Sequence, residues 1–130
     1  MSGKINLTLK VDVVSGPSIS VSKEITVEAY DKIDVAIDTG VSDKPVEIQP
    51  GSSNQVQMLL IKPSKCGEEL TYKVGDTSAT PIVLDQEQLF LGQGAVGLLG
   101  TELDKLFFTN NLTEAVTIEI LVGRDATPEP

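Results

Sequence analysis

Apolar and polar residues alternate strictly near the start of this chain. Every odd position from Ile5 to Val13 is apolar, with polar residues between them, and the alternation resumes over Ile25–Ala29 and Ile33–Ile37. A period of two is typical of β-strands with one dry and one wet face. We therefore predict that these apolar residues are buried on one side of a sheet. On that interpretation Leu9→Ala costs about 2–5 kcal/mol of stability.

The chain as a whole has the spacing of an all-β protein. A Gly-Pro turn at Ser15–Ser18 ends the first strand. The next run, Ile19–Tyr30, is long for one strand, and we expect a bulge at Ser22–Lys23 that turns the lysine outward. Turn signals then recur roughly every 8–12 residues between short apolar runs. This pattern predicts an antiparallel β-sandwich of jelly-roll-like form.

One helical turn is the only helix that the pattern predicts. Thr101–Asp104 resembles a capping box, and Leu103, Leu106 and Phe107 recur at helical spacing, so at most one short turn is expected near residues 101–107. Residues 1–125 are expected to form a single β-sandwich domain, and residues 126–130 a mobile C-terminal tail.

Later strands of the chain are apolar on both faces. In a two-layer sandwich each strand has only one core face, so a loop, a helix or another subunit must cover the second one. Coverage by a subunit predicts a homo-oligomer interface, since large apolar patches are rarely left open to water. The candidate interface residues are Val56, Met58, Leu60, Leu89, Phe90, Leu91, Leu106, Phe107 and Phe108.

Composition narrows the chemistry further. The chain has 130 residues, a formal net charge of −9, no histidine and one cysteine, Cys66. The negative charge disfavours nucleic acid and anionic membranes as partners and favours solubility or a cationic protein partner. Without histidine the commonest general base is missing, so no enzyme, catalytic residue or metal site is expected. We interpret Asp31, Asp34, Asp38 and Asp43 as a solvated face rather than a calcium site, because no compact calcium loop is present.

A glycine motif in the last third of the chain requires a separate explanation. Gly92–Gly97 matches the dinucleotide fingerprint GxGxxG, but that motif needs a strand before it, a helix after it and a second parallel strand. The surrounding pattern is antiparallel, so we predict a glycine-rich bend or bulge and no cofactor, with no binding of NAD, FAD or ATP.

The N-terminus and the apolar runs bear on location. Met1–Lys4 leads directly into a strand without the apolar stretch of a secretory signal, and no apolar run approaches the roughly 20 residues that span a bilayer. Synthesis in a cytoplasm, with no membrane partner, is therefore expected.

Residues 86–127 resemble a known family. The stretches Leu103–Asn111 and Ala115–Asp125 are similar to those of phage head decoration, or cement, proteins. The resemblance implies a jelly roll or β-sandwich on the outside of an icosahedral viral shell. There it would form dimers or trimers and stabilise contacts between capsomers of the major capsid protein. A small ligand- or carbohydrate-binding β-module is the alternative, with an enzyme a distant third.

Overall fold

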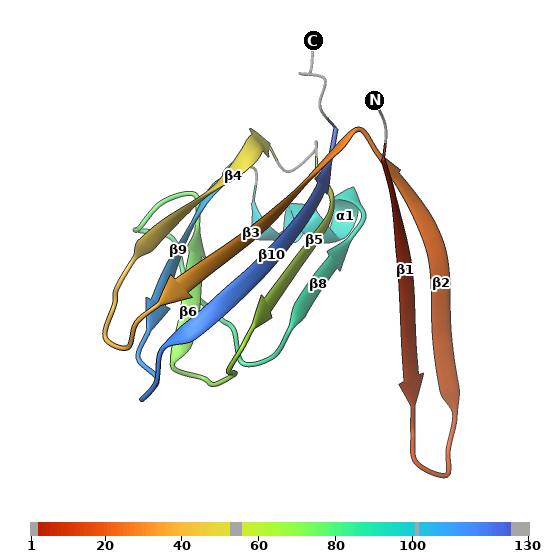
Figure 1. The fold of residues 1–130 in the computed structure, drawn as a ribbon, viewed down its shortest axis with the longest axis horizontal. Coiled ribbons are helices and arrows are strands. Elements are labelled where there is room, and N and C mark those ends of the chain that lie inside the picture. Colours follow the sequence, from red (N-terminus) through yellow and green to blue (C-terminus); the bar gives the residue numbers. More distant parts are fainter. Residues whose placement is uncertain (1–2, 53–55, 101, 126–130) are drawn as a thin grey trace.

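The fold is that of an eight-stranded body with a separate hairpin, as seen in a computed structural model that describes residues 3–52, 56–100 and 102–125 (Figure 1). The expected tail lies outside the described residues. The strands are β1 (Gly3–Asp12), β2 (Ser18–Val27), β3 (Ala29–Ile37), β4 (Lys44–Ser52), β5 (Val56–Pro63), β6 (Leu70–Val74), β7 (Ile82–Val83), β8 (Gln88–Leu91), β9 (Glu102–Asn110) and β10 (Val116–Arg124).

The body is a jelly roll, which confirms the predicted fold class. One sheet has the strand order β3-β10-β5-β8 and the other the order β4-β9-β6-β7. The antiparallel pairs are nested along the chain, since β3 pairs with β10, β4 with β9, β5 with β8, and β6 with β7. A long hairpin rolled up on itself produces this nesting, and it is the topology of the double-sheet jelly roll.

The core lies between the two sheets and explains the body's alternating strands. Ile118, Ile120 and Val122 of β10 point inward, and each is fully buried. Tyr72 of β6 and Phe108 of β9 are the largest buried side chains, and their rings lie 5.6 Å apart with an interplanar angle of 35°. The tilted arrangement at this separation is a favourable geometry for two aromatic rings.

The helical segment lies earlier in the chain than the sequence predicts. A four-residue helix, α1 (Gln93–Val96), and a 3-10 turn, η2 (Gly97–Leu99), follow β8. Residues 102–107 belong instead to β9, in which Leu103 and Leu106 are fully buried in the core. The prediction of a helical turn near 101–107 is therefore wrong, and Thr101 itself lies outside the described residues. Of the glycine-rich bend or bulge expected at Gly92–Gly97, the structure has a bend at Gly92, and the residues after it form this short helical segment.

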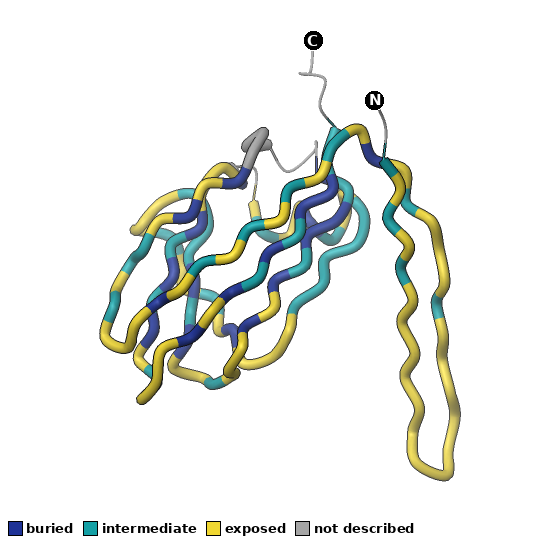
Figure 2. Tube along the Cα trace, viewed as in Figure 1, coloured by how far each residue is buried: buried dark blue, intermediate teal, exposed yellow. Residues whose placement is uncertain are grey.

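The first two strands differ most from expectation. β1 and β2 form a two-stranded sheet of their own, which projects from the body (Figures 1 and 2). We call residues 3–27 the arm. Its register is continuous from the Gly3–Val27 pair to the Asp12–Ser18 pair, so the bulge predicted at Ser22–Lys23 is absent and Lys23 pairs with Leu7. The predicted burial of the arm's odd positions fails toward the tip, because no second layer covers the arm there.

Candidate interaction surface

The arm presents an apolar face made by both of its strands. In an antiparallel pair, directly opposed residues project to the same side of the sheet. The register opposes Ile5 to Ile25, Leu9 to Val21 and Val11 to Ile19. The apolar face of the arm therefore comprises Ile5, Leu7, Leu9, Val11, Ile19, Val21, Ile25 and Val27, with Lys23 as the charged member.

Exposure of this face rises from the base of the arm to its tip. Val27 at the base is 1% exposed, whereas Leu9, Val11 and Ile19 are 44%, 53% and 68% exposed. Figure 2 shows the change, with buried and half-buried residues near the body and only exposed residues at the tip of the arm. An isolated two-stranded hairpin is marginally stable in water, and contiguous exposed apolar surface marks interaction sites. The outer half of the arm is thus the strongest candidate functional surface.

The base of the arm packs on the outer face of the β3-β10-β5-β8 sheet. The side chains of Ile5, Val27 and Met58 surround the Cα of Gly123 on β10. Val27 and Met58 are buried there although they lie outside the main core. The absence of a side chain at Gly123 is what permits so close an approach.

Polar contacts hold the same junction. A single residue, Glu28, connects β2 to β3, and its backbone N–H donates a 3.0 Å hydrogen bond to the carbonyl of Arg124. The Arg124 Nε lies 2.7 Å from the Asp31 carboxylate, and the Gln57 amide donates to Asp125 at 3.2 Å. The arm therefore leaves the body from a well-anchored base.

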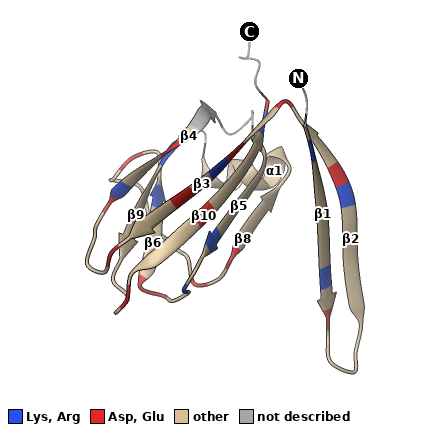
Figure 3. Cartoon of the chain, in the orientation of Figure 1, with Lys and Arg blue, Asp and Glu red and all other residues tan. Residues whose placement is uncertain are grey.

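The opposite face of the arm is polar. Lys4 pairs with Glu24 at 3.5 Å, and Lys10 pairs with Asp12 at 3.7 Å, all with exposed side chains. Figure 3 shows these charges spaced along both strands. Exposed ion pairs contribute little stability. Their effect is to keep one face of the arm wet, while the apolar face is left without a cover.

The structure divides the nine interface residues predicted from the sequence into two groups. Val56, Met58, Leu106 and Phe108 are buried within the protomer, at 2% exposure or less, so they are packing residues and not interface residues. Leu60, Leu89, Phe90, Leu91 and Phe107 are half-buried. Of these, Phe90 packs against the core, and Phe107 lies on the outer side of the other sheet.

Three of the remaining residues gather on one surface. Leu60 of β5 pairs with Leu89 of β8 and with Leu121 of β10. Two residues along β8, Leu91 pairs with Met58, which lies at the base of the arm. These register positions alternate with core residues, so they lie on the outer face of the sheet. We call Leu60, Leu89, Leu91 and Leu121 the leucine strip. The sequence prediction did not include Leu121, although the signal was present: Ile120, Leu121 and Val122 are three consecutive apolar residues, so β10 is apolar on both faces at that point.

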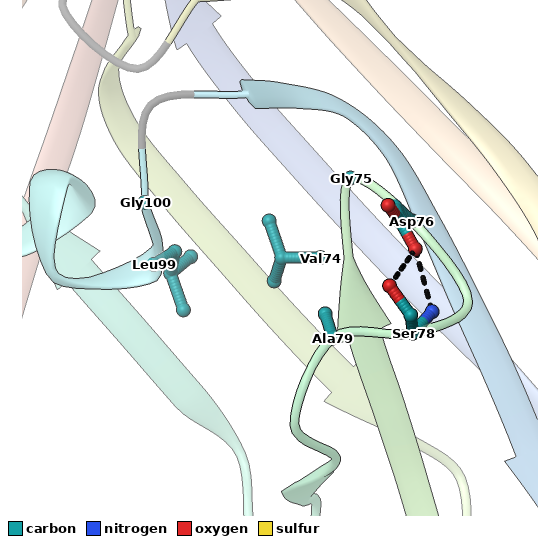
Figure 4. A pocket seen from close by; sticks show the side chains of 7 residues that line it. All are labelled: Val74, Gly75, Asp76, Ser78, Ala79, Leu99 and Gly100. Atoms are coloured by element: carbon teal, nitrogen blue, oxygen red, sulfur yellow. Dashed lines mark hydrogen bonds between the residues drawn. The ribbon is translucent and has the colours of Figure 1, made fainter.

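Two hollows in the described part of the chain offer space for a small ligand. One, of about 240 Å³, is lined by the loop after β6 and by η2, and Asp76, Ser78 and Leu99 lie around it (Figure 4). Both the hydroxyl and the backbone N–H of Ser78 donate to Asp76, which lowers the pKa of that carboxyl. The second, of about 210 Å³, lies at the arm's base beside Lys23, Ile25 and Leu91. Both are below the roughly 300–1,000 Å³ of typical ligand sites.

Aspartates that were considered as a calcium site are engaged in ion pairs. Asp31, Asp34 and Asp43 each form an ion pair, with Arg124, Lys32 and Lys73. Within residues 3–52, 56–100 and 102–125, no three Cys, Asp or Glu side chains gather as a metal site.

Neither Cys66 nor the glycine motif forms a reactive or nucleotide-binding site. Cys66 is exposed, and desolvation together with the carboxylates of Glu87 and Asp85 raises the pKa of its thiol, which makes the thiolate scarcer. The segment Gly92–Gly97 does follow a strand, but its helix has four residues, and β8 pairs with an antiparallel neighbour. The geometry that the dinucleotide fingerprint needs is therefore missing.

Comparison of the chain with protein families, with curated proteins and with solved structures finds no match. No helix in the described part of the chain is long and apolar enough to cross a membrane.

Proposed function

We propose that this protein is a structural interaction protein that decorates the outside of a viral shell, and that an interaction made by the arm is needed for it to stay there. The observation that carries an interaction role is the apolar face of the arm, which is exposed from Leu9 to Ile19. A solvent-exposed apolar surface of this extent is stabilised when a partner covers it, at about 25 cal/mol per Å² removed from water.

One further observation agrees with the viral shell as the setting. The body has the jelly-roll topology that is common among viral capsid domains, as expected from the resemblance proposed for residues 86–127 from the sequence. The same topology also occurs in lectins and other binding proteins, so the fold alone does not separate the two functions.

A ligand- or carbohydrate-binding module is less well supported. The two hollows are small, and the chain has no tryptophan to stack against a sugar ring. The aromatic side chains Tyr72 and Phe108 are buried in the core, out of reach of a ligand.

The proposal is tested by the abundance of the protein on particles. Val11→Gln with Ile19→Gln makes the arm's apolar face polar, and Ser18→Gln with Ser20→Gln alters the opposite face without changing the charge. Virions carrying each version are purified from the native source, and copies per particle are counted by quantitative mass spectrometry and electron microscopy. We expect many copies of the wild type and of the control, and few of the apolar-face variant. Absence of the wild-type protein from purified particles would overturn the shell role.

A further inference from the structure

The contact at the base of the arm shows what kind of surface the apolar face of the arm fits. Ile5 and Val27 pack over Gly123 and Met58, on the outer face of the β3-β10-β5-β8 sheet. Each partner in this contact is an aliphatic side chain or bare backbone. The residues at the base of the arm thus already cover part of the outer face of this sheet.

The same outer face continues beyond the covered part as the leucine strip. Leu121, Leu60 and Leu89 lie side by side across three strands, and each remains half-buried. Lys62 and Glu119, 3.8 Å apart, border the strip, and Lys32 lies 3.1 Å from Glu119. The strip is therefore an apolar patch with a charged margin, which is the usual anatomy of a protein interface.

The arm and the strip diverge within one chain. The arm stands clear of β8 along most of its length (Figure 1), so its outer half does not cover the leucine strip of its own body. Glu28 is the only residue between β2 and β3, and its hydrogen bond to Arg124 holds the angle at which the arm leaves. Two apolar surfaces of matching chemistry are thus left open in the same molecule.

Charge is distributed unevenly between the arm and the body. Residues 1–27 contain three lysines and two acidic side chains, a net charge of +1, whereas residues 28–130 contain seven Lys or Arg and 17 Asp or Glu, a net charge of −10. Lys23 lies within the apolar face of the arm. Electrostatics therefore favours contact between an arm and a body over contact between two bodies.

We propose that the arm of one copy lies across the leucine strip of a second copy, in an exchange of arms between copies. This inference rests on the proposed interaction role of the arm and names its immediate partner. Each copy offers one arm and one strip, so the exchange closes either as a reciprocal dimer or as a small ring. Both apolar surfaces of every copy are then covered.

The test is the mass of the full-length protein in solution. Sedimentation equilibrium is measured for the wild type, for an arm variant (Val11→Gln with Ile19→Gln) and for a strip variant (Leu60→Gln with Leu121→Gln). We expect the wild type to be a dimer or a ring, and each variant to dissociate with a Kd raised about 100-fold, since two aliphatic side chains lose their burial. Ser18→Gln with Ser20→Gln is the matched control and should assemble like the wild type.

Mixing the two variants distinguishes arm exchange from arm-to-arm pairing. The arm variant keeps an intact strip and the strip variant keeps an intact arm. An equimolar mixture should therefore form heterodimers at concentrations where each variant alone is monomeric. If the strip variant assembles normally, the arms pair with each other and the proposal is wrong. A wild type that stays monomeric at all concentrations also overturns it, as expected if the arm closes on its own sheet. Circular dichroism checks folding, and Leu89→Gln on the edge strand β8 replaces the strip variant if that variant unfolds.

The failure of this proposal is distinct from the failure of the shell role. An oligomer that assembles as described but is missing from virions refutes the shell and leaves the exchange standing. A monomer whose arm variant is lost from virions refutes the exchange and leaves the shell role standing.

Discussion

Ile5 packs against the backbone of Gly123 so closely that a β-carbon on Gly123 would lie 2.9 Å from the Ile5 Cδ1 atom. A real β-carbon essentially never approaches another heavy atom that closely, so the arm must shift if Gly123 gains a side chain. The same added atom would lie 3.0 Å from Val27. The lack of a side chain at Gly123 therefore permits the close packing of the arm against the body.

Gly123→Ala should loosen the arm at its base. Overpacking of this kind typically costs about 1–3 kcal/mol, and its effect should be concentrated in the arm. Hydrogen exchange measured by mass spectrometry should show faster exchange in residues 3–27, with little change in the strands of the body. Gly97→Ala is the control, because its φ of −63° suits alanine and no atom lies within 4 Å of the added carbon. Equal exchange in Gly123→Ala and the wild type would contradict this packing.

Leucines of the arm and of the body should differ sharply in their contribution to stability. Leu59 is fully buried in the core, so Leu59→Ala should cost about 2–5 kcal/mol. Leu9 is 44% exposed, so Leu9→Ala should cost less than about 1 kcal/mol in the dissociated protein. Urea unfolding at low protein concentration measures both. A loss at Leu9 as large as that at Leu59 would mean that the arm is covered within the monomer.

Asn110 should be the most sensitive polar side chain of the body. It is fully buried, donates to the carbonyls of Ile37 and Glu114 at 2.9 and 3.0 Å, and accepts a 2.9 Å hydrogen bond from the N–H of Leu112. Asn110→Ala leaves these groups without partners and should cost about 1–3 kcal/mol. Thermal unfolding against the exposed neighbour variant Asn111→Ala provides the comparison, and equal melting temperatures for the two variants would refute the prediction.

The stability of the protein should fall in alkaline solution, in part because of Tyr72. Burial raises the pKa of this phenol above its usual value of 10.0, and its hydroxyl donates a 2.6 Å hydrogen bond to Gln88. Above pH 10 the unfolded chain loses the Tyr72 proton while the folded chain keeps it. The free energy of unfolding therefore falls by up to about 1.4 kcal/mol per pH unit.

Tyr72→Phe removes that titration. At pH 8 the free energy of unfolding of the variant should be about 1 kcal/mol lower than that of the wild type, because the substitution removes the hydrogen bond. Its stability should fall less steeply between pH 10 and 11. Urea unfolding at both pH values measures the difference, with the exposed Tyr30 and the lysines as common background. Identical alkaline slopes for the two proteins would show that Tyr72 ionises freely in the folded state.

The apolar face of the arm could be predicted from the sequence, but its exposure to solvent could not. The alternation of Ile5–Val13 correctly predicts a strand with one apolar face, and the Gly-Pro turn correctly ends it, with the N–H of Gly16 donating to the carbonyl of Val13 at 2.8 Å. The one local sign of an uncovered face was Lys23 on the apolar side of its strand. Its charge is tolerated there because that face meets solvent and not a core.

Most strands, their turns and the apolar side of each strand follow from the local pattern, because these depend on residues that are neighbours along the chain. The periods of Ile5–Val13 and of Val116–Val122 are alike, yet one strand lies in the arm and the other in the core. Contacts between segments distant in the sequence separate the two cases, since burial depends on whether another layer faces the strand. The nested pairing of β3 through β10 supplies that layer for the body, and β1 and β2, outside the nest, are left without one.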